Sequence, residues 1–269
     1  MTTQCDYAEL RRTACRLAEL GVLTARPFFG KVGSTRKADD TPVTEADHAA
    51  QAAILDALAR LHPAHAVLTE EIVARPQQHA AAGAAEFCWV VDPIDGTRNF
   101  GRGVGLWSTS VAVLQDGRPV AGAVCDATNE RTYSASVSEG AFVGTQQLRL
   151  RDRPIDGDTT IAISSLRRRA MPAAVRGWLD CYLYRNLGSL CLHLAWVAAG
   201  LFDAAYAWEC KTWDVAAGSL LIEQAGGLVT DHAGNPIWPV DVAKYRGEDL
   251  PILAGPPAMH ARLLQDLRS

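Results

Sequence analysis

A continuous apolar run, Phe87 to Val91, ends at two carboxylates in the segment Asp92-Pro93-Ile94-Asp95-Gly96-Thr97. An uninterrupted run of this length predicts a strand that is buried on both faces. Two carboxylates at the end of a buried strand repel each other unless a cation lies between them. Their oxygens suit Mg²⁺, which also keeps water and binds substrate phosphate. A turn with solvated aspartates is the alternative that the spacing alone leaves open.

Hydrophobic periodicity divides the chain on either side of a polar stretch at 149–158. Apolar residues at helical spacing predict helices over 6–26, 44–61, 190–199 and 214–225. Short apolar runs bounded by turn residues predict strands over 66–68, 87–91, 107–114, 119–125, 131–136, 141–143, 160–164, 183–185, 227–230 and 251–254. The earlier strands favour an antiparallel sheet with a hairpin turn at Asp116-Gly117, and the later strands alternate with helices. We therefore expect two domains, an α+β half at 1–150 and an α/β half at 151–269.

Charge and cysteine content exclude several classes of protein. The formal net charge of −4 gives no basic footprint for nucleic acid. The seven cysteines have no C-x-x-C spacing, which favours buried thiols in a reducing compartment. The longest apolar stretch, 190–208, is interrupted by His193 and Asp203, so it does not predict a membrane span. We expect a cytoplasmic protein that binds neither nucleic acid nor membrane.

Three further acidic groups lie at the ends of predicted elements. Thr69-Glu70-Glu71 follows an apolar strand, where a solvated glutamate pair is the alternative to a ligand. Asp214 opens an apolar helix directly after Trp213, where an ordinary N-cap is the alternative. Thr44 and Asp47 begin another helix at the spacing of a capping pair. Each of these three groups is a weak signal on its own.

Together the four acidic segments resemble the inositol monophosphatase family, within the Mg²⁺-dependent, lithium-sensitive phosphatase superfamily that includes fructose-1,6-bisphosphatase. The resemblance covers nearly the whole chain. The segments that carry it are TEAD at 44–47, TEEI at 69–72, DPIDGTRNF at 92–100 and WDVAAGSLLIEQAGG at 213–227. It implies a layered α-β-α-β-α sandwich of the inositol monophosphatase and fructose-1,6-bisphosphatase type, with mixed α+β and α/β character.

The resemblance also implies a role for particular residues. The family's metal ligands fall on Glu70, Asp92, the backbone carbonyl of Ile94, Asp95 and Asp214, which would hold two or three Mg²⁺ ions per site. Catalytic roles fall on Asp47, Glu70, Asp92 and Thr97, and the Thr97 hydroxyl would pair with Asp47 and help the metal activate water. Substrate contacts fall on Asp95, Gly96, Thr97, Ser165, Gly188, Ser189, Glu209 and Asp214. Most of the metal ligands would belong to 1–150, while Asp214 and the pocket residues would belong to 151–269.

The substrate is less closely defined by the resemblance. Inositol-specific members carry a hydroxyl-binding Glu where this chain has Ala207, and Glu209 is the candidate replacement. Residues 100–107 look more like bacterial histidinol-phosphate phosphatases, whereas Gly188-Ser189 looks like the inositol or sugar-phosphate branch. We expect hydrolysis of a small phosphorylated metabolite similar to inositol monophosphate. Histidinol phosphate and fructose 1,6-bisphosphate are the alternative substrates.

Two expectations concern regulation and assembly. A catalytically silent regulatory binding protein is the alternative from a different class, and a homodimer is the expected assembly. The run Arg167-Arg168-Arg169 predicts a solvated loop, and a phosphate contact is the less favoured reading.

Overall fold

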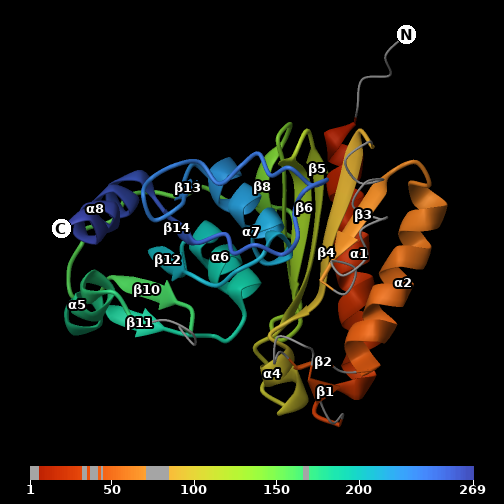
Figure 1. Ribbon diagram of the computed structural model, residues 1–269, viewed down its shortest axis with the longest axis horizontal. Coiled ribbons are helices and arrows are strands. Elements are labelled where there is room, and N and C mark those ends of the chain that lie inside the picture. Colours follow the sequence, from red (N-terminus) through yellow and green to blue (C-terminus); the bar gives the residue numbers. More distant parts are fainter. Residues whose placement is uncertain (1–5, 32–34, 37–41, 44, 71–84, 166–169) are drawn as a thin grey trace.

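The computed structural model describes residues 6–31, 35–36, 42–43, 45–70, 85–165 and 170–269. Its elements stack in alternating helix and sheet layers (Figure 1). From one side to the other, the layers are α1 (Tyr7–Ala25) with α2 (Glu45–Leu61), a seven-stranded sheet, α6 (Leu190–Ala198) with α7 (Thr212–Gln224), a five-stranded sheet, and α5 (Ala173–Cys181) with α8 (Pro257–Arg268). The expected α-β-α-β-α sandwich is confirmed.

The seven-stranded sheet has its strands in chain order. They are β3 (Ala66–Thr69), β4 (Phe87–Asp95), β5 (Ser108–Gln115), β6 (Arg118–Asp126), β7 (Arg131–Ser136), β8 (Gly140–Val143) and β9 (Gln146–Gln147). Only β3 and β4 pair in parallel, so Thr69 and Val91 lie side by side near their carboxyl ends. Asp116 (φ 50°) and Gly117 (φ 73°) form the predicted hairpin turn between β5 and β6.

The five-stranded sheet has the order β11-β10-β12-β14-β13. Its strands are β10 (Thr160–Ile163), β11 (Leu183–Arg185), β12 (Ala204–Ala207), β13 (Leu228–Thr230) and β14 (Ile252–Gly255). The sequence did not predict β12, because this strand lies within the apolar stretch 190–208 without a change of hydrophobic period. Helices α5 and α8 were also missed. The boundary expected near residue 150 falls between β9 and β10, and the division into two domains stays a prediction.

Short elements complete the described chain. They are the 3-10 turn η1 (Arg26–Phe28), the antiparallel pair β1 (Thr35–Arg36) and β2 (Pro42–Val43), and the helix α4 (Thr97–Gly101). Thr44, Glu71 and Arg167-Arg168-Arg169 lie outside the described residues, so the expectations for them stand as stated.

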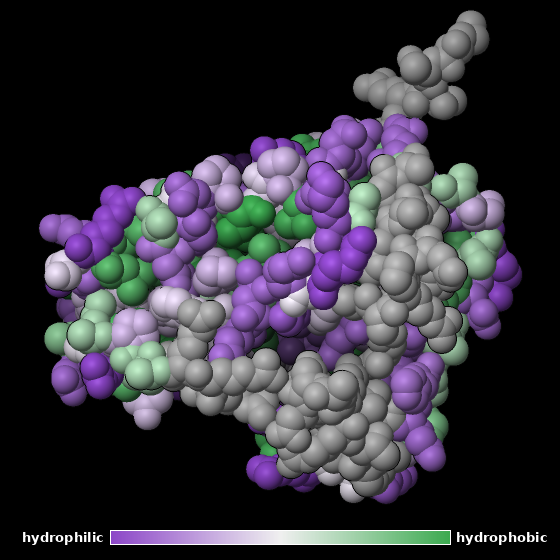
Figure 2. Space-filling view, viewed as in Figure 1, coloured by the Kyte–Doolittle hydropathy of each residue, from purple (hydrophilic) through white to green (hydrophobic). Residues whose placement is uncertain are grey.

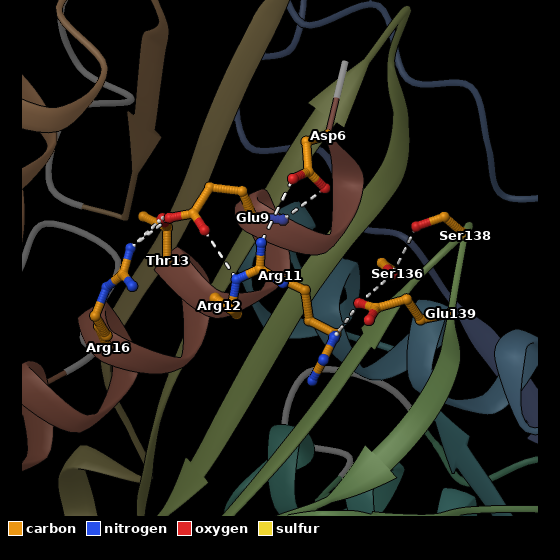
Figure 3. A network of polar contacts seen from close by, with 9 residues as sticks. All are labelled: Asp6, Glu9, Arg11, Arg12, Thr13, Arg16, Ser136, Ser138 and Glu139. Carbon is orange, nitrogen blue, oxygen red and sulfur yellow. Dashed lines mark hydrogen bonds and ion pairs between the residues drawn. The ribbon is translucent and has the colours of Figure 1, made fainter. Parts of the chain in front are cut away.

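Helix α1 has one buried face and one charged face. Its buried residues recur every three or four positions, and Asp6 caps its first turn by accepting from the Glu9 amide at 3.1 Å. The charged face carries a network of ion pairs (Figure 3). Arg11 Nε lies 2.8 Å from Glu139 Oε2, and its guanidinium lies over the Phe142 ring at 4.8 Å. These contacts fasten α1 to the β7–β8 hairpin.

Helices α6 and α7 lie between the two sheets and contribute to the largest hydrophobic core. On the outside, hydrophilic side chains predominate among the coloured atoms of Figure 2, and hydrophobic side chains show as separate groups between them. Within the described parts of the chain, none of the helices combines the length and apolar character needed to cross a membrane.

Candidate metal centre

Strand β4 carries the first two carboxylates into the interior. The strand does not end at Asp92-Pro93 as the sequence predicted, but continues to Asp95 with a shift in its register against β5. The shift lets the Ile94 amide donate to Asp92 Oδ1 at 3.1 Å. Asp92 is only 2% exposed. The backbone at the irregular end of β4 therefore holds the buried Asp92 carboxylate in place.

Asp95 is held by the beginning of helix α6. The Ser189 hydroxyl and the Cys191 amide both donate to Asp95 Oδ2, at 2.5 and 2.6 Å. Ser189 is also the N-cap of α6, since its hydroxyl accepts from the Leu192 amide at 3.2 Å. One serine therefore caps a helix and orients a carboxylate from another layer of the fold.

Asp214 enters the site from the first turn of α7. The helix begins at Thr212 with Lys211 as N-cap, so Asp214 is not the N-cap that the sequence left open as an alternative. Its Oδ2 accepts from the Lys211 amide at 2.7 Å. The Lys211 ammonium points to the neighbouring loop, where it donates to the Gly247 carbonyl and pairs with Asp249 at 2.7 Å.

Burial and mutual repulsion raise the pKa values of the acidic side chains at this centre. Burial raises the pKa of Asp92 well above its usual range, and repulsion from other carboxylates adds to this, in decreasing order Glu70, Asp95, Asp214 and Asp47. Burial followed by repulsion from Asp95 likewise raises the pKa of Asp214 well above its usual range. Burial also raises the pKa of Asp95, although the Ser189 and Cys191 hydrogen bonds oppose this rise. The fold thus gathers five acidic side chains, which we call the acidic cluster: Asp47, Glu70, Asp92, Asp95 and Asp214.

The donor set of the acidic cluster fits a hard divalent cation. Mg²⁺ takes oxygen ligands and is bound through a few carboxylates plus water. A nearby cation favours the charged form of a carboxylate, so it would reverse the upward pKa shifts that burial and repulsion cause. Glu70 joins the cluster because it directly follows β3, which runs parallel to β4. Asp47 comes from the first turn of α2 and is 2% exposed.

Thr97 and Gly96 form the turn after β4. Gly96 has φ 92°, and a Cβ there would meet the Leu106 carbonyl oxygen at 2.9 Å, so both the turn and the close packing require glycine. The Thr97 hydroxyl donates to the Ile94 carbonyl at 2.9 Å. The expected pairing of Thr97 with Asp47 stays a prediction, as does the ligand role of the Ile94 carbonyl.

The segment 186–189 packs directly on helix α4. Gly188 has φ 74°, and a Cβ there would meet the Asn99 side-chain nitrogen at 2.7 Å. Asn99 Nδ2 donates to the Leu106 carbonyl at 2.6 Å and to the Leu187 carbonyl at 2.7 Å. Gly188 and Ser189, expected from sequence to line the pocket, are therefore held against the end of β4.

Ser165 and Glu209, which the sequence also predicts to contact substrate, lie on other segments of the fold. Ser165 is exposed after β10, and its hydroxyl accepts from Asn186 Nδ2 at 2.9 Å. Glu209 is half-buried between β12 and α7. Ala207 ends β12, and its side chain is buried in the core between the sheets. Their roles toward a substrate stay predictions.

Two residues of α6 at this centre were not singled out by the sequence. The sequence predicts Cys191 only as one of the buried thiols, and in the structure its thiol donates to the Asp214 carbonyl at 3.3 Å. His193 Nε2 accepts from the Leu187 amide at 2.8 Å, and this bond holds the 186–189 segment against α6. The signal that could have found them is their place in the first turn of an apolar helix, directly after Gly188-Ser189.

Comparisons with known proteins place this arrangement in a family. The model of the inositol monophosphatase family matches residues 6–269. A relative named Nus factor SuhB from Pasteurella multocida is 34% identical over 207 residues, which is 75% of this chain and 76% of the relative. The protein of the same name from Escherichia coli K12 is 33% identical over 211 residues, 76% of each chain.

Solved structures agree. Mycobacterium tuberculosis SuhB is 28% identical with a TM-score of 0.76, covering 98% of both chains. Inositol monophosphatase from Anabaena is 25% identical with a TM-score of 0.78, covering 97% of this chain and 95% of its own. The chain belongs to the inositol monophosphatase family.

Proposed function

We propose that this protein is a Mg²⁺-dependent phosphomonoesterase that hydrolyses a small phosphorylated metabolite resembling an inositol monophosphate. The observation that carries the proposal is the acidic cluster, whose buried carboxylates raise one another's pKa and fit a divalent cation. Family membership supports a phosphatase. We propose Glu70, Asp92, the Ile94 carbonyl, Asp95 and Asp214 as the ligands of two or three Mg²⁺ ions.

The chain's own groups would hold the ligands in fixed orientations. Mg²⁺ bound by these oxygens would neutralise charge on the phosphoryl group and generate a nucleophile from water near neutral pH. Ser189 and the Cys191 amide fix Asp95, and the Lys211 amide fixes Asp214. Such hydrogen bonds preorganise a site, so the carboxylates do not have to reorient during the reaction.

Ala207 and Glu209 bear on which substrates the proposed enzyme accepts. Ala207 offers no polar group where a hydroxyl-binding Glu was expected of an inositol-specific enzyme, so discrimination among hydroxylated substrates should be relaxed. Inositol monophosphate is then one of several accepted substrates, with histidinol phosphate and fructose 1,6-bisphosphate as the alternatives. The kcat/KM values of the three, measured in wild type and in Glu209→Gln, test this proposal. A strong preference for inositol monophosphate that is the same in wild type and in Glu209→Gln would contradict the proposed relaxed specificity.

Asp92→Asn tests the phosphatase itself. We expect hydrolysis of a generic phosphate monoester at saturating Mg²⁺ to fall by at least the roughly 100- to 1000-fold that losing one electrostatic group costs an active site. Without metal, the variant should be more stable than wild type, because burial and neighbouring charges disfavour the ionised Asp92. Urea unfolding with a chelator present measures this second effect.

Asp126→Asn is the matched control for this test. Asp126 is equally buried but lies on β6, where it accepts from backbone amides and from Trp196 Nε1. Its variant should keep turnover. Near-wild-type turnover in Asp92→Asn would contradict the proposed assignment of the metal ligands.

A binding function without turnover is the second candidate, and the name Nus factor carried by several relatives favours it. In that case the chain would act as a regulatory binding protein. The hydrolysis assay with the three candidate substrates separates the two functions. A catalytically silent protein shows no Mg²⁺-dependent hydrolysis with any of them.

Three further properties belong to the proposal. Inhibition by Li⁺ would follow from replacing one Mg²⁺ with a smaller charge at the same oxygens. A homodimer is supported by Leu183 and Tyr184, which are exposed on the edge strand β11, and light scattering measures it. A cytoplasmic location is supported by the six described cysteines, which are all free.

A further inference from the structure

The thiol of Cys191 lies against the carboxylates of the acidic cluster. Among the described residues, Cys191 Sγ and one carboxylate oxygen each of Asp92 and Asp95 lie within 4.8 Å of one another. Cys191 is fully buried in the first turn of α6. A hard cation such as Mg²⁺ prefers oxygen, so the proposed phosphatase does not use this sulfur.

The spacing of these three atoms suits one thiophilic ion. Zinc binds sulfur at about 2.3 Å and carboxylate oxygen at about 2.0–2.2 Å in tetrahedral geometry, so two ligand atoms on one ion lie roughly 3.4–3.6 Å apart. The three atoms, which lie within 4.8 Å of one another, therefore need to approach by no more than roughly 1.4 Å. Backbone and serine donors already hold Asp95 in place, which limits the reorganisation needed.

We propose that Cys191 makes this centre a site for a borderline or soft divalent cation (Zn²⁺, Co²⁺ or Cd²⁺), bound by the Cys191 sulfur with Asp92 and Asp95 in competition with Mg²⁺. The sulfur would bind as thiolate, and the thiol proton, which Cys191 donates to the Asp214 carbonyl in this structure, would leave to solvent. Zinc stands above the harder divalent ions in affinity for mixed sulfur and oxygen donors. It would therefore displace Mg²⁺ and inhibit hydrolysis. The inference rests on the metal centre of the proposed function.

Cobalt gives a readout that does not depend on turnover. Co²⁺ added to the purified full chain without Mg²⁺ should produce a sulfur-to-cobalt charge-transfer band in the near ultraviolet. Cys191→Ser should lose the band. Zinc, titrated by competition against cobalt or a chelating dye, should bind this variant more weakly by at least the roughly 10- to 100-fold that losing an outer-shell partner costs a metal site.

Cys210→Ser is the matched control. Its thiol is also buried and donates to a backbone carbonyl, that of Leu250 at 2.6 Å, but it is not part of the three-atom group. The band should survive in this variant. Circular dichroism checks the folding of every variant, and Cys191→Ala replaces Cys191→Ser if the serine is not tolerated.

The outcomes separate this inference from the proposed function. A band that persists in both Cys191 variants, or no band in wild type, overturns the sulfur ligand even if Mg²⁺-dependent hydrolysis is found. A band lost only on changing Cys191 supports the ligand even if no phosphate ester is hydrolysed, in which case the phosphatase proposal alone fails.

Discussion

Helices α1 and α7 cover opposite faces of the seven-stranded sheet, but only α1 has a face in water. In α1 the buried positions recur with helical spacing and the others carry charges. In α7 every residue from Thr212 to Ile222 is buried except Asp214, which is half-buried. A polar residue in α1 has solvent to face, whereas a polar residue at the start of a middle-layer helix must find a partner inside the protein.

This difference shows where the polar contacts of the candidate site lie. Three polar residues of the middle layer, Ser189, His193 and Asp214, lie at or near the beginnings of α6 and α7, and each has a defined partner there. The charges of α1 instead pair along the surface. Changes at the beginnings of α6 and α7 should therefore alter the site and the stability together, and changes on the charged face of α1 should alter stability alone.

The largest expected effect on stability comes from the middle-layer histidine. Burial lowers the pKa of His193 from 6.5 to about 4, because the ring is removed from water and its Nε2 accepts from the Leu187 amide. As pH falls from 6.5, the unfolded chain takes up a proton that the folded chain refuses. About 3 kcal/mol of stability should therefore be lost by pH 4.

Urea unfolding at pH 7 and pH 4.5 measures this loss. His193→Gln cannot titrate, so the drop between the two pH values should be smaller in the variant than in wild type. Comparing the drops removes the contribution of the carboxylates, which both proteins share. Equal drops would show that the histidine does not carry the pH dependence.

A glycine in each kind of layer gives the next comparison. A Cβ on Gly218 in α7 would lie 2.5 Å from Leu194 Cβ in α6, whereas a Cβ on Gly177 in the outer helix α5 would meet nothing within 4 Å. Gly218→Ala should cost about 1–3 kcal/mol, because the two packed helices must move apart. Gly177→Ala should stabilise by up to about 1 kcal/mol, since alanine favours helix. Thermal unfolding checks both signs, and a stabilising Gly218→Ala would refute the close packing.

Two helix caps give a third comparison. Ser189 and Asp6 both accept from a backbone amide in the first turn of their helices, but only Ser189 also donates to Asp95. Each alanine variant should lose about 1 kcal/mol of stability. Only Ser189→Ala should also lose turnover, by roughly 10- to 100-fold as for other groups that orient a metal ligand. If Asp6→Ala lowers kcat as much, the distinction between the layers fails.

The smallest effect is expected at the surface network. Glu139→Gln breaks the ion pair with Arg11 but leaves the guanidinium over Phe142. The loss should be below about 1 kcal/mol and should shrink in high salt, because both side chains of this pair are only partly buried and remain in contact with water. Unfolding measured at low and high ionic strength tests this, and a large loss that is independent of salt would be inconsistent with it.

The sequence predicted α1, the hairpin strands and the acidic segments better than β12, α5 and α8. The period of α1 and the alternation of the hairpin strands follow directly from which faces meet water. In 190–208 that signal vanishes, since both the helix α6 and the strand β12 are buried all round. The acidic segments were recognised by their residue types and spacing, but their meeting depends on how the layers stack.

The contacts inside the candidate site could not be predicted from the sequence either. The bonds from Ser189 and Cys191 to Asp95 join residues 94 and 96 positions apart, and no local pattern specifies such a pair. The Thr97 hydroxyl donates to a backbone carbonyl, which depends on the register shift in β4. The role of Cys191 depends on which side of α6 faces the cluster, a matter that an evenly apolar helix leaves undefined.

The distance along the chain between β4 and α7 sets the timing of assembly during synthesis. Asp214 follows Asp95 by 119 residues (214 − 95), so a ribosome adding about 5–20 residues per second needs roughly 6–24 s to make the intervening chain. Throughout that interval the nascent chain carries Asp92 and Asp95 without Asp214 of α7, and for most of it also without Ser189 and Cys191 at the beginning of α6. Any folding of the first sheet and its outer helices before α7 is made would therefore take place with the acidic cluster still incomplete.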